Sequence, residues 1–260
     1  MNNDTVPLYF EEFGSGIPIV LVHGFPLDHT IWEPVVAPLT KHSRIVLPDL
    51  RGFGRSPVPP GKTSIRMMAE DLVVLLDLLK IDKAIMVGHS MGGYICLSFA
   101  QAYPHRLAGL GLVATQAAAD TPEKRQARFN TADEVERHGV KVIADNMVPK
   151  LTANAELQTV LRELILKTDP IGVIGALKAM AERPDSTGLL SSISVPSVVL
   201  AGSVDTLIPI ERSKTMAQLL ARAWLAELPG VGHMPMMEAP QQAAETLRQL
   251  IHAVEGFAPG

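Results

Sequence analysis

The sequence has little of what staples a small protein together or anchors it in a membrane. Its 260 residues include a single cysteine, Cys96, so neither an internal disulfide nor a thiolate metal cluster can form. No apolar run approaches the ~18 residues that would span a membrane. The N-terminal segment has neither the basic nor the apolar region of a signal peptide. We therefore expect a soluble, cytoplasmic protein that is stabilised by its own apolar core.

An excess of charge of one sign is also missing. The 23 Lys and Arg residues face 27 Asp and Glu residues, and no basic run offers the phosphate neutralisation on which nucleic-acid binding rests. There is no His-x-x-x-His pair to hold a metal. Gly88–Gly93 lacks the lysine of a phosphate-binding loop, and Gly52-x-Gly54 lacks the third glycine of a dinucleotide motif. The sequence predicts no metal, no cofactor, and neither a nucleic-acid nor a membrane partner.

Short apolar runs alternate with longer amphipathic stretches, which is typical of an α/β protein with a mostly parallel sheet. The stretch at Ser64–Leu79 has apolar residues at helical spacing, with Thr63 or Ser64 as its cap, and a last helix is expected at Gln241–Val254, entered through Pro240. Strands are expected at Pro7–Phe13, Ile17–Val22, Arg44–Leu47, Ala84–Val87, Leu107–Val113, Val195–Ala201 and Ala223–Leu228.

The alternation breaks between Gln116 and Asp185. Segments such as Glu156–Lys167 and Ile171–Ala181 look helical, and the strand pattern resumes only at Val195. Two more crossover helices would be the simpler account, but the stretch is too long for one connection. We therefore predict an α/β core at residues 1–115 and 186–260, with a helical cap inserted at residues 116–185.

One motif carries chemistry. Gly88-His89-Ser90-Met91-Gly92 follows an expected strand and opens an expected helix, which is the context of a G-x-S-x-G nucleophile. A sharp turn would lift the Ser90 hydroxyl above the sheet, where the N–H groups of the helix N-terminus face a developing oxyanion. We predict that Ser90 is a nucleophile; the alternative is a glycine-rich turn with an incidental serine.

A serine hydroxyl needs a base, and the base needs an orienting acid. Behind a serine of this kind the chain order is acid, then histidine. His233 lies in a loop just after the last expected strand, and Asp205 follows the strand before it. We predict that His233 takes the serine proton and that Asp205 fixes its tautomer. A solvated histidine and an ordinary turn aspartate are the alternatives.

A second oxyanion donor is expected from the loop after Val22, where Gly24 permits a tight turn. The predicted oxyanion hole consists of the backbone N–H groups of Phe25 and Met91. The preceding histidine, His23, is expected to hold its loop in place, and His89 to point away from the pocket if Ser90 points in.

The substrate pocket is less defined by the sequence. Apolar, adaptable side chains are expected to form its wall, although ordinary core packing is the alternative for each methionine. No cluster of Arg or Lys stands beside the motifs, which favours a neutral acyl substrate. The expected wall residues, besides Phe25 and Met91, are Leu27, Met147, Met180 and Met234.

With these residues in view, the chain resembles the α/β-hydrolase superfamily over nearly its whole length. The resemblance implies an α/β-hydrolase fold, with a mostly parallel eight-stranded sheet flanked by helices and a helical cap. It also implies a structural role for the Arg-Gly-x-Gly-x-Ser segment that begins at Arg51. The matching stretches are His23–Pro26, Asp49–Ser56, Gly88–Gly93, Gly202–Pro209 and Gly232-His233.

Closer similarity is to the carboxylesterase and 3-oxoadipate enol-lactonase-like branch. It is carried by Phe25–His29, Ser90–Gly93 and Arg183–Thr187. His89 stands where the lactonases usually have leucine, which favours an esterase. Haloalkane dehalogenases and epoxide hydrolases are similar overall but use an aspartate where this chain has Ser90, which argues against both.

The sequence thus predicts a carboxylic ester hydrolase that works through an acyl-enzyme on a small-molecule ester or lactone, as a monomer or homodimer. Three alternatives stay open: an enol-lactone hydrolase, a hydrolase that cleaves a carbon–carbon bond of a diketone, and a slow-turnover ligand-binding or signalling protein of the same fold.

Overall fold

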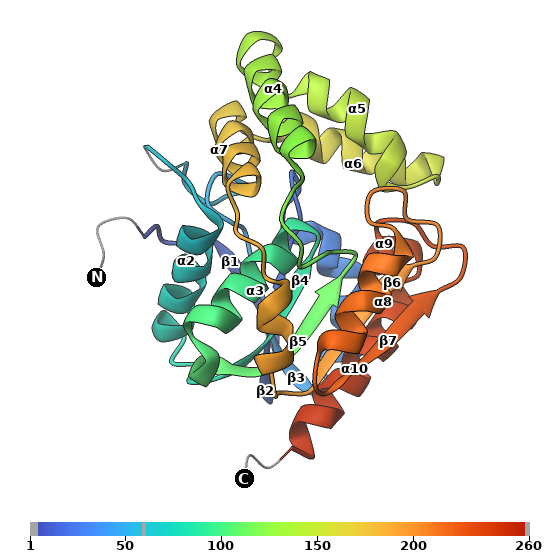
Figure 1. Ribbon diagram of the computed structural model, residues 1–260. Helices are drawn as coiled ribbons and strands as arrows, with labels where there is room; N and C mark the ends of the chain where they lie inside the picture. The colour runs from blue at the N-terminus through green and yellow to red at the C-terminus, as the bar shows by residue number, and fades with distance from the viewer. Residues whose placement is uncertain (1–4, 59–60, 258–260) are drawn as a thin grey trace.

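The alternating pattern folds into a mostly parallel sheet (Figure 1). The computed structural model describes residues 5–58 and 61–257, so the two ends of the predicted core domain, 1–4 and 258–260, lie outside the described residues. The strand order is β1-β3-β2-β4-β5-β6-β7, and β1 alone pairs antiparallel within the described sheet. The strands are β1 (Phe10–Gly14), β2 (Ile17–Val22), β3 (Ser43–Pro48), β4 (Ala84–His89), β5 (Leu107–Val113), β6 (Ser197–Gly202) and β7 (Ala223–Leu228).

The described sheet has seven strands, not the eight that the resemblance implied. Each of the seven apolar runs in the sequence forms one strand, and no further run was available to form an eighth. The register aligns the ends of neighbouring strands: Val22 pairs with Gly88, His89 with Val113 and Gly202 with Leu228. Because parallel strands end at one edge of the sheet, the loops after β2, β4, β6 and β7 meet there.

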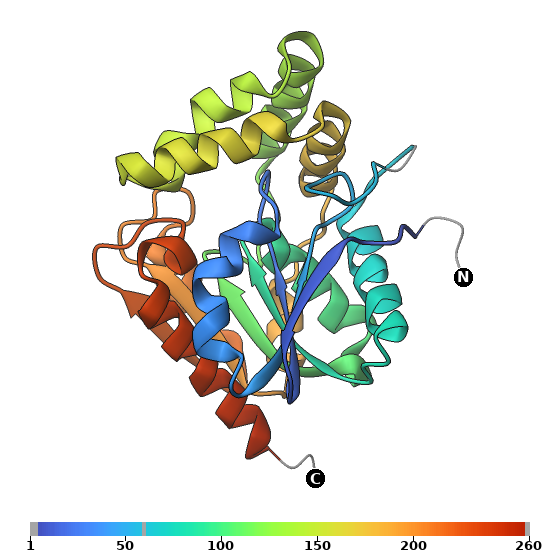
Figure 2. The same cartoon turned by 180° about the vertical axis from the view of Figure 1, so that it is seen from behind.

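Helices cover both faces of the sheet. Figure 2 shows α1 (Glu33–Leu39) and α10 (Pro240–Glu255) on one face, and Figure 1 shows α2 (Ile65–Leu78), α3 (Met91–Ala102) and α8 (Ile210–Leu219) on the other. The helix α2 begins where the sequence predicts, because the Ser64 hydroxyl accepts a hydrogen bond of 3.1 Å from Met67 N. The remaining core elements are the one-turn helix α9 (Pro235–Glu238) and the 3₁₀ turns His29–Trp32, Pro104–Arg106 and Thr187–Ser192.

The break in the pattern is a helical insertion, as predicted. Figures 1 and 2 show its four helices above one end of the sheet, where α4 packs against α7 and α5 against α6. Ser186 N donates a 3.0 Å hydrogen bond to Ala117 O and so ties the two ends of the insertion together. We call the insertion the cap; its helices are α4 (Pro122–His138), α5 (Lys141–Leu151), α6 (Ala155–Lys167) and α7 (Pro170–Ala181).

The cap is placed on the core by a contact between two glycines. Gly172 of α7 lies so close to Gly52 that a Cβ on Gly52 would come within 2.7 Å of the Gly172 Cα, and a Cβ on Gly172 would meet the Gly52 carbonyl oxygen. Thr168, just before α7, adds a 3.2 Å hydrogen bond from its hydroxyl to Pro26 O. The Gly52 segment, for which the sequence predicted a structural role, therefore contacts α7 and positions the cap on the core.

None of the helices in the described residues is long and apolar enough to cross a lipid bilayer.

Candidate active site

Ser90 occupies a strained turn between β4 and α3. Its backbone has φ 51° and ψ −113°, a conformation that costs energy for any residue with a side chain. A Cβ at Gly88 would collide with the backbone of Gly92, and a Cβ at Gly92 would collide with the Val22 carbonyl. The two glycines of the motif are therefore required by close packing of backbone on backbone.

His233 and Asp205 form a buried pair at the same edge of the sheet. His233 Nδ1 donates to Asp205 Oδ2 over 2.7 Å, and the two residues are 2% and 9% exposed. The other carboxylate oxygen of Asp205 accepts hydrogen bonds from Leu207 N at 2.8 Å and Ile208 N at 3.0 Å. With Nδ1–H committed to Asp205, Nε2 is the ring nitrogen of His233 that is left to accept a proton.

His89 supports the loop of His233 from below. Its Nε2 donates a 2.9 Å hydrogen bond to the His233 carbonyl, and the two rings lie 4.9 Å apart. Complete burial, and then the nearby charge of His233, lower the pKa of His89 well below its usual value. His89 is therefore a neutral donor and does not line the cavity described below.

His23 holds two loops together, as the sequence indicated. Its Nε2 accepts from Leu50 N at 2.9 Å, and its Nδ1 donates to Gly24 O at 3.0 Å. Burial lowers the pKa of His23, although the charge of Asp49 opposes that shift. With both ring nitrogens engaged, His23 is not available as a base.

The two predicted oxyanion donors are the backbone amides of Phe25, in the loop after β2, and of Met91, at the start of α3. Phe25 follows Gly24 and lines the cavity, and within the described residues its amide donates no hydrogen bond. The amide of Met91 is the first of α3, a position that has no acceptor inside the helix. Gly24 lies against the imidazole of His89, since a Cβ there would come within 2.5 Å of Nδ1. His89 thus packs beneath both loops.

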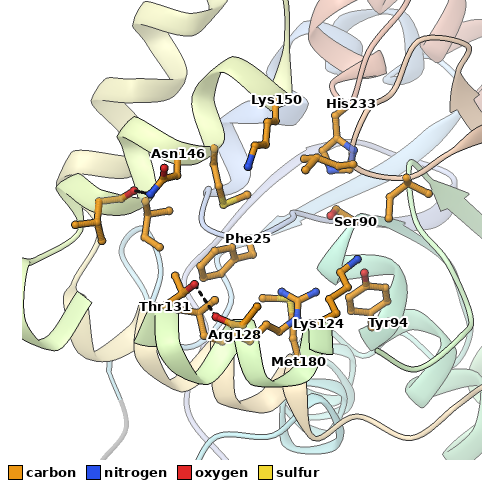
Figure 3. Close-up of a pocket in the computed structure, with 17 residues that line it drawn as sticks. Phe25, Ser90, Tyr94, Lys124, Arg128, Thr131, Asn146, Lys150, Met180 and His233 are labelled. Atoms are coloured by element: carbon orange, nitrogen blue, oxygen red, sulfur yellow. Dashed lines mark hydrogen bonds between the residues drawn. The ribbon is translucent and has the colours of Figure 1, made fainter. Parts of the chain in front are cut away.

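Ser90 and His233 open onto one cavity of about 390 Å³ between the core and the cap (Figure 3). Of the residues expected to form its wall, Met147 of α5 and Met180 of α7 do so, together with Phe25. Leu27, Met91 and Met234, by contrast, are 1%, 0% and 0% exposed and do not line the cavity, because their side chains pack into the apolar core. The lining residues are Phe25, Ser90, Tyr94, Lys124, Ala127, Arg128, Thr131, Val142, Ile143, Asn146, Met147, Lys150, Leu177, Met180, Leu207, Ile208 and His233.

No cations were predicted at the site from the sequence, and here the structure differs. Lys124 and Arg128 of α4 and Lys150 of α5 all line the cavity. They are far from Ser90 along the chain, so only the folding of the cap over the sheet brings them near. The signal in the sequence was the helical spacing of Lys124, Arg128 and Thr131, which puts all three on one face of α4.

One group of side chains in the described residues has the geometry to hold a metal ion: Asp28, His29 and Asp49. Its polar atoms are already used, because Asp49 Oδ1 accepts from His29 Nδ1 at 2.7 Å and from His29 N at 2.9 Å. Asp28 Oδ1 accepts from Thr30 N at 3.0 Å, as a cap of the 3₁₀ turn. These residues shape the loop after β2 and lie outside the cavity lining.

Comparison with known proteins agrees with this architecture. A model of the alpha/beta hydrolase fold family matches residues 17–240, so the chain belongs to that family. Its homologues include esterases and enol-lactonases. A thermophilic esterase from Thermogutta terrifontis, solved with malate bound, is 41% identical, with a TM-score of 0.92 over 95% of this chain and 93% of that one.

Two further relatives are more distant. The enol-lactonase from Burkholderia xenovorans LB400 is 27% identical, with a TM-score of 0.87 over 94% of this chain and 96% of that one. A dihydrolipoyllysine-residue acetyltransferase component of the acetoin cleaving system from Pseudomonas putida is 30% identical over 252 residues. The match covers 92% of this chain and only 65% of that protein. The chain is a hydrolase of α/β fold.

Proposed function

We propose that the protein is a serine carboxylesterase. The Ser90 hydroxyl attacks the ester carbonyl while His233 Nε2 takes its proton, and Asp205 stabilises the imidazolium without taking the proton itself. The Phe25 and Met91 amides hold the oxyanion of the tetrahedral intermediate. His233 then protonates the leaving alcohol, and a water molecule repeats the sequence on the acyl-enzyme.

One observation carries this proposal: the buried 2.7 Å pair of His233 and Asp205 opens onto the same cavity as a serine in a strained turn. A solvated histidine beside an ordinary turn aspartate would not be 2% exposed. The rest of the arrangement serves the same purpose, since His89 and the Leu207 and Ile208 amides fix the base and its acid.

The relatives support an ester or lactone as the substrate. The Thermogutta terrifontis protein is described as an esterase, and the Burkholderia xenovorans protein as an enol-lactonase. Both reactions begin with attack on an acyl carbonyl, so the machinery described here serves either. Because the more similar structure is the esterase, we propose simple carboxylic esters first.

The test is hydrolysis of p-nitrophenyl esters of increasing acyl length, with a lactone alongside, by the wild type, Ser90→Ala and Ser98→Ala. Ser98 lies on the same helix but outside the cavity, so its variant controls for preparation and folding. We expect Ser90→Ala to lose on the order of 10⁴- to 10⁶-fold in kcat and Ser98→Ala to match the wild type. A fluorophosphonate should label the wild type once, at Ser90. Undiminished hydrolysis by Ser90→Ala would overturn the assignment.

A further inference from the structure

The wall that the cap contributes to the cavity carries positive charge that is not neutralised. Lys124 of α4 and Lys150 of α5 are both exposed and both line the cavity. Neither makes an ion pair with any part of the chain that the structure describes. Figure 3 shows both ammonium groups directed into the cavity, on either side of Ser90 in that view.

The carboxylate at this corner of the cap is already engaged. The side chain of Asp120 is fully buried, and it pairs with Arg128 Nε and, at 3.1 Å, with Arg183 Nη1. Among the described residues that line the cavity, none is Asp or Glu. Although Lys124 is solvent-accessible, the protein atoms around it desolvate its ammonium group and lower its pKa, and the charge of Arg128 lowers it further. A negative charge in the cavity would relieve this repulsion.

A purely solvated pair of lysines is the alternative account. Lysines on a solvated face keep their ammonium groups in bulk water. These two come from different helices and converge on one cavity, the one that also contains Ser90 and His233. Its volume of about 390 Å³ lies in the range that holds a small ligand, so both charges are within reach of a single bound molecule.

We propose that the substrates are esters or lactones that carry a second, ionised carboxylate, and that Lys124 and Lys150 bind it. This inference rests on the serine hydrolase function proposed above. Lysine binds a carboxylate as a point charge on a flexible stem, which suits the open wall of a cavity. The neutral acyl substrate that the sequence favoured is thereby replaced by an anionic one.

The experiment compares two pairs of substrates that differ in charge but not in shape. Monomethyl glutarate is paired with methyl 5-methylhexanoate, in which an isopropyl group replaces the carboxylate. Likewise, 4-acetoxybutanoate is paired with 4-methylpentyl acetate, so that the carboxylate is tested on the acid side and on the alcohol side of the ester. Hydrolysis is followed in a pH-stat for the wild type, Lys124→Gln, Lys150→Gln and the double variant. The control is Lys167→Gln, an exposed lysine of α6 outside the cavity.

We expect kcat/KM to favour the anionic member of at least one pair by about tenfold, through a lower KM. The preference should fall in each single variant, vanish in the double variant and weaken as salt is added. Lys167→Gln should keep both this preference and the wild-type rate on the neutral esters, and in the Lys124 and Lys150 variants the neutral member of each pair should lose less rate than the anionic member. Equal rates for both members of both pairs, or a preference that survives in the double variant, would overturn the proposal.

The neutral esters keep the two proposals apart. If Ser90 hydrolyses them and no anionic preference exists, the esterase function stands and the carboxylate site does not. If no ester is hydrolysed in a Ser90-dependent way, calorimetry with glutarate and the Ser90→Ala protein tests the site alone. Binding that the double lysine variant loses would support the carboxylate site, and absence of binding would refute it.

Discussion

The core and the cap place opposite kinds of polar residues at and behind the wall of the cavity. On the core side, His233 and Asp205 are nearly inaccessible to solvent, and their hydrogen bonds fix one geometry. On the cap side, Lys124 and Lys150 are exposed and have flexible side chains. Groups that form and break bonds must be held rigidly, whereas groups that recognise a substrate can adapt to it. Under the proposed function, the core therefore sets the rate of the chemistry and the cap selects the substrate.

The core and the cap are nevertheless joined directly by a hydrogen bond at His233, the proposed general base. His233 N donates a 3.2 Å hydrogen bond to the carbonyl of Leu151, the last residue of α5. The buried charges at the other side of the cap, Asp120 and Arg183, lie where the insertion leaves and re-enters the core. We therefore expect changes in the cavity wall to alter mainly KM, and loss of the buried ion pairs where the insertion leaves and re-enters the core to alter mainly stability.

The largest expected effect is on the core side. Asp205→Asn keeps the size of the side chain but lets His233 adopt the wrong tautomer, and we expect kcat to fall by about 10⁴-fold. KM for a neutral ester should change little, because Asp205 does not line the cavity. Steady-state kinetics on a p-nitrophenyl ester provides the measurement. If the main defect of Asp205→Asn is in KM, the assignment of chemistry to the core and of substrate binding to the cap is wrong.

The next largest expected effect is on stability, at the ion pairs of Asp120 where the insertion leaves the core. Asp120→Asn leaves the buried guanidinium group of Arg183 and the partly buried one of Arg128 without a counter-charge, and we expect the free energy of unfolding to fall by about 3 kcal/mol. Urea unfolding at pH 7 measures this. Asp133→Asn, at an exposed position of α4, should stay within about 0.5 kcal/mol of the wild type.

The same pair predicts a pH dependence. Burial opposes ionisation of Asp120, but the hydrogen bond and charge of Arg128 prevail, so its pKa is lowered in the folded protein. The folded state therefore binds fewer protons, and the stabilisation is complete above the unfolded pKa near 4. The stability gap between the wild type and Asp120→Asn should be constant from pH 7 to about pH 5 and should narrow as the pH falls further. A gap that widens in acid would contradict this.

A smaller effect is expected where the cap rests on the core. In Gly172→Ala, the new methyl group meets the carbonyl of Gly52, which costs about 1–3 kcal/mol, while the gain in helix propensity returns up to ~1 kcal/mol. α7 must shift, so KM should rise more than kcat falls. Gly188→Ala, where a Cβ would meet open space, is the matched control. An unchanged KM in Gly172→Ala would show that the contact between Gly52 and Gly172 does not determine the shape of the cavity.

How much the sequence reveals differs between the same two regions. The turn at Ser90 and its glycines are local, because the strand, the turn and the helix are contiguous in the chain, and the expected elements there match β4 and α3. The loops of Asp205 and His233 could be located because parallel strands end at one edge. The apolar wall residues Phe25, Met147 and Met180 were predicted, but its cations were not, since Lys124 and Lys150 reach the cavity only through the packing of α4 and α5 over the sheet. Leu27 was wrongly predicted to line the cavity for a related reason: its closeness in sequence to Phe25 does not tell which way its side chain points.

The smallest effect expected comes from His89, on the core side. Burial lowers its pKa, so the folded protein keeps it neutral while the unfolded chain protonates it below about pH 6.5. The unfolded state then binds more protons, and His89 costs about 1.4 kcal/mol of stability for each pH unit below that value, until its folded pKa is reached. His89→Gln, which keeps a donor for the His233 carbonyl, should lose about 1 kcal/mol less than the wild type between pH 7.5 and pH 5.5. Urea unfolding at both pH values measures this difference, and His105→Gln, at an exposed position, should behave as the wild type. Equal losses of stability in His89→Gln and the wild type would mean that His89 is protonated in the folded protein. The rigidity attributed to the core side of the cavity would then not extend to the residue that holds the His233 loop.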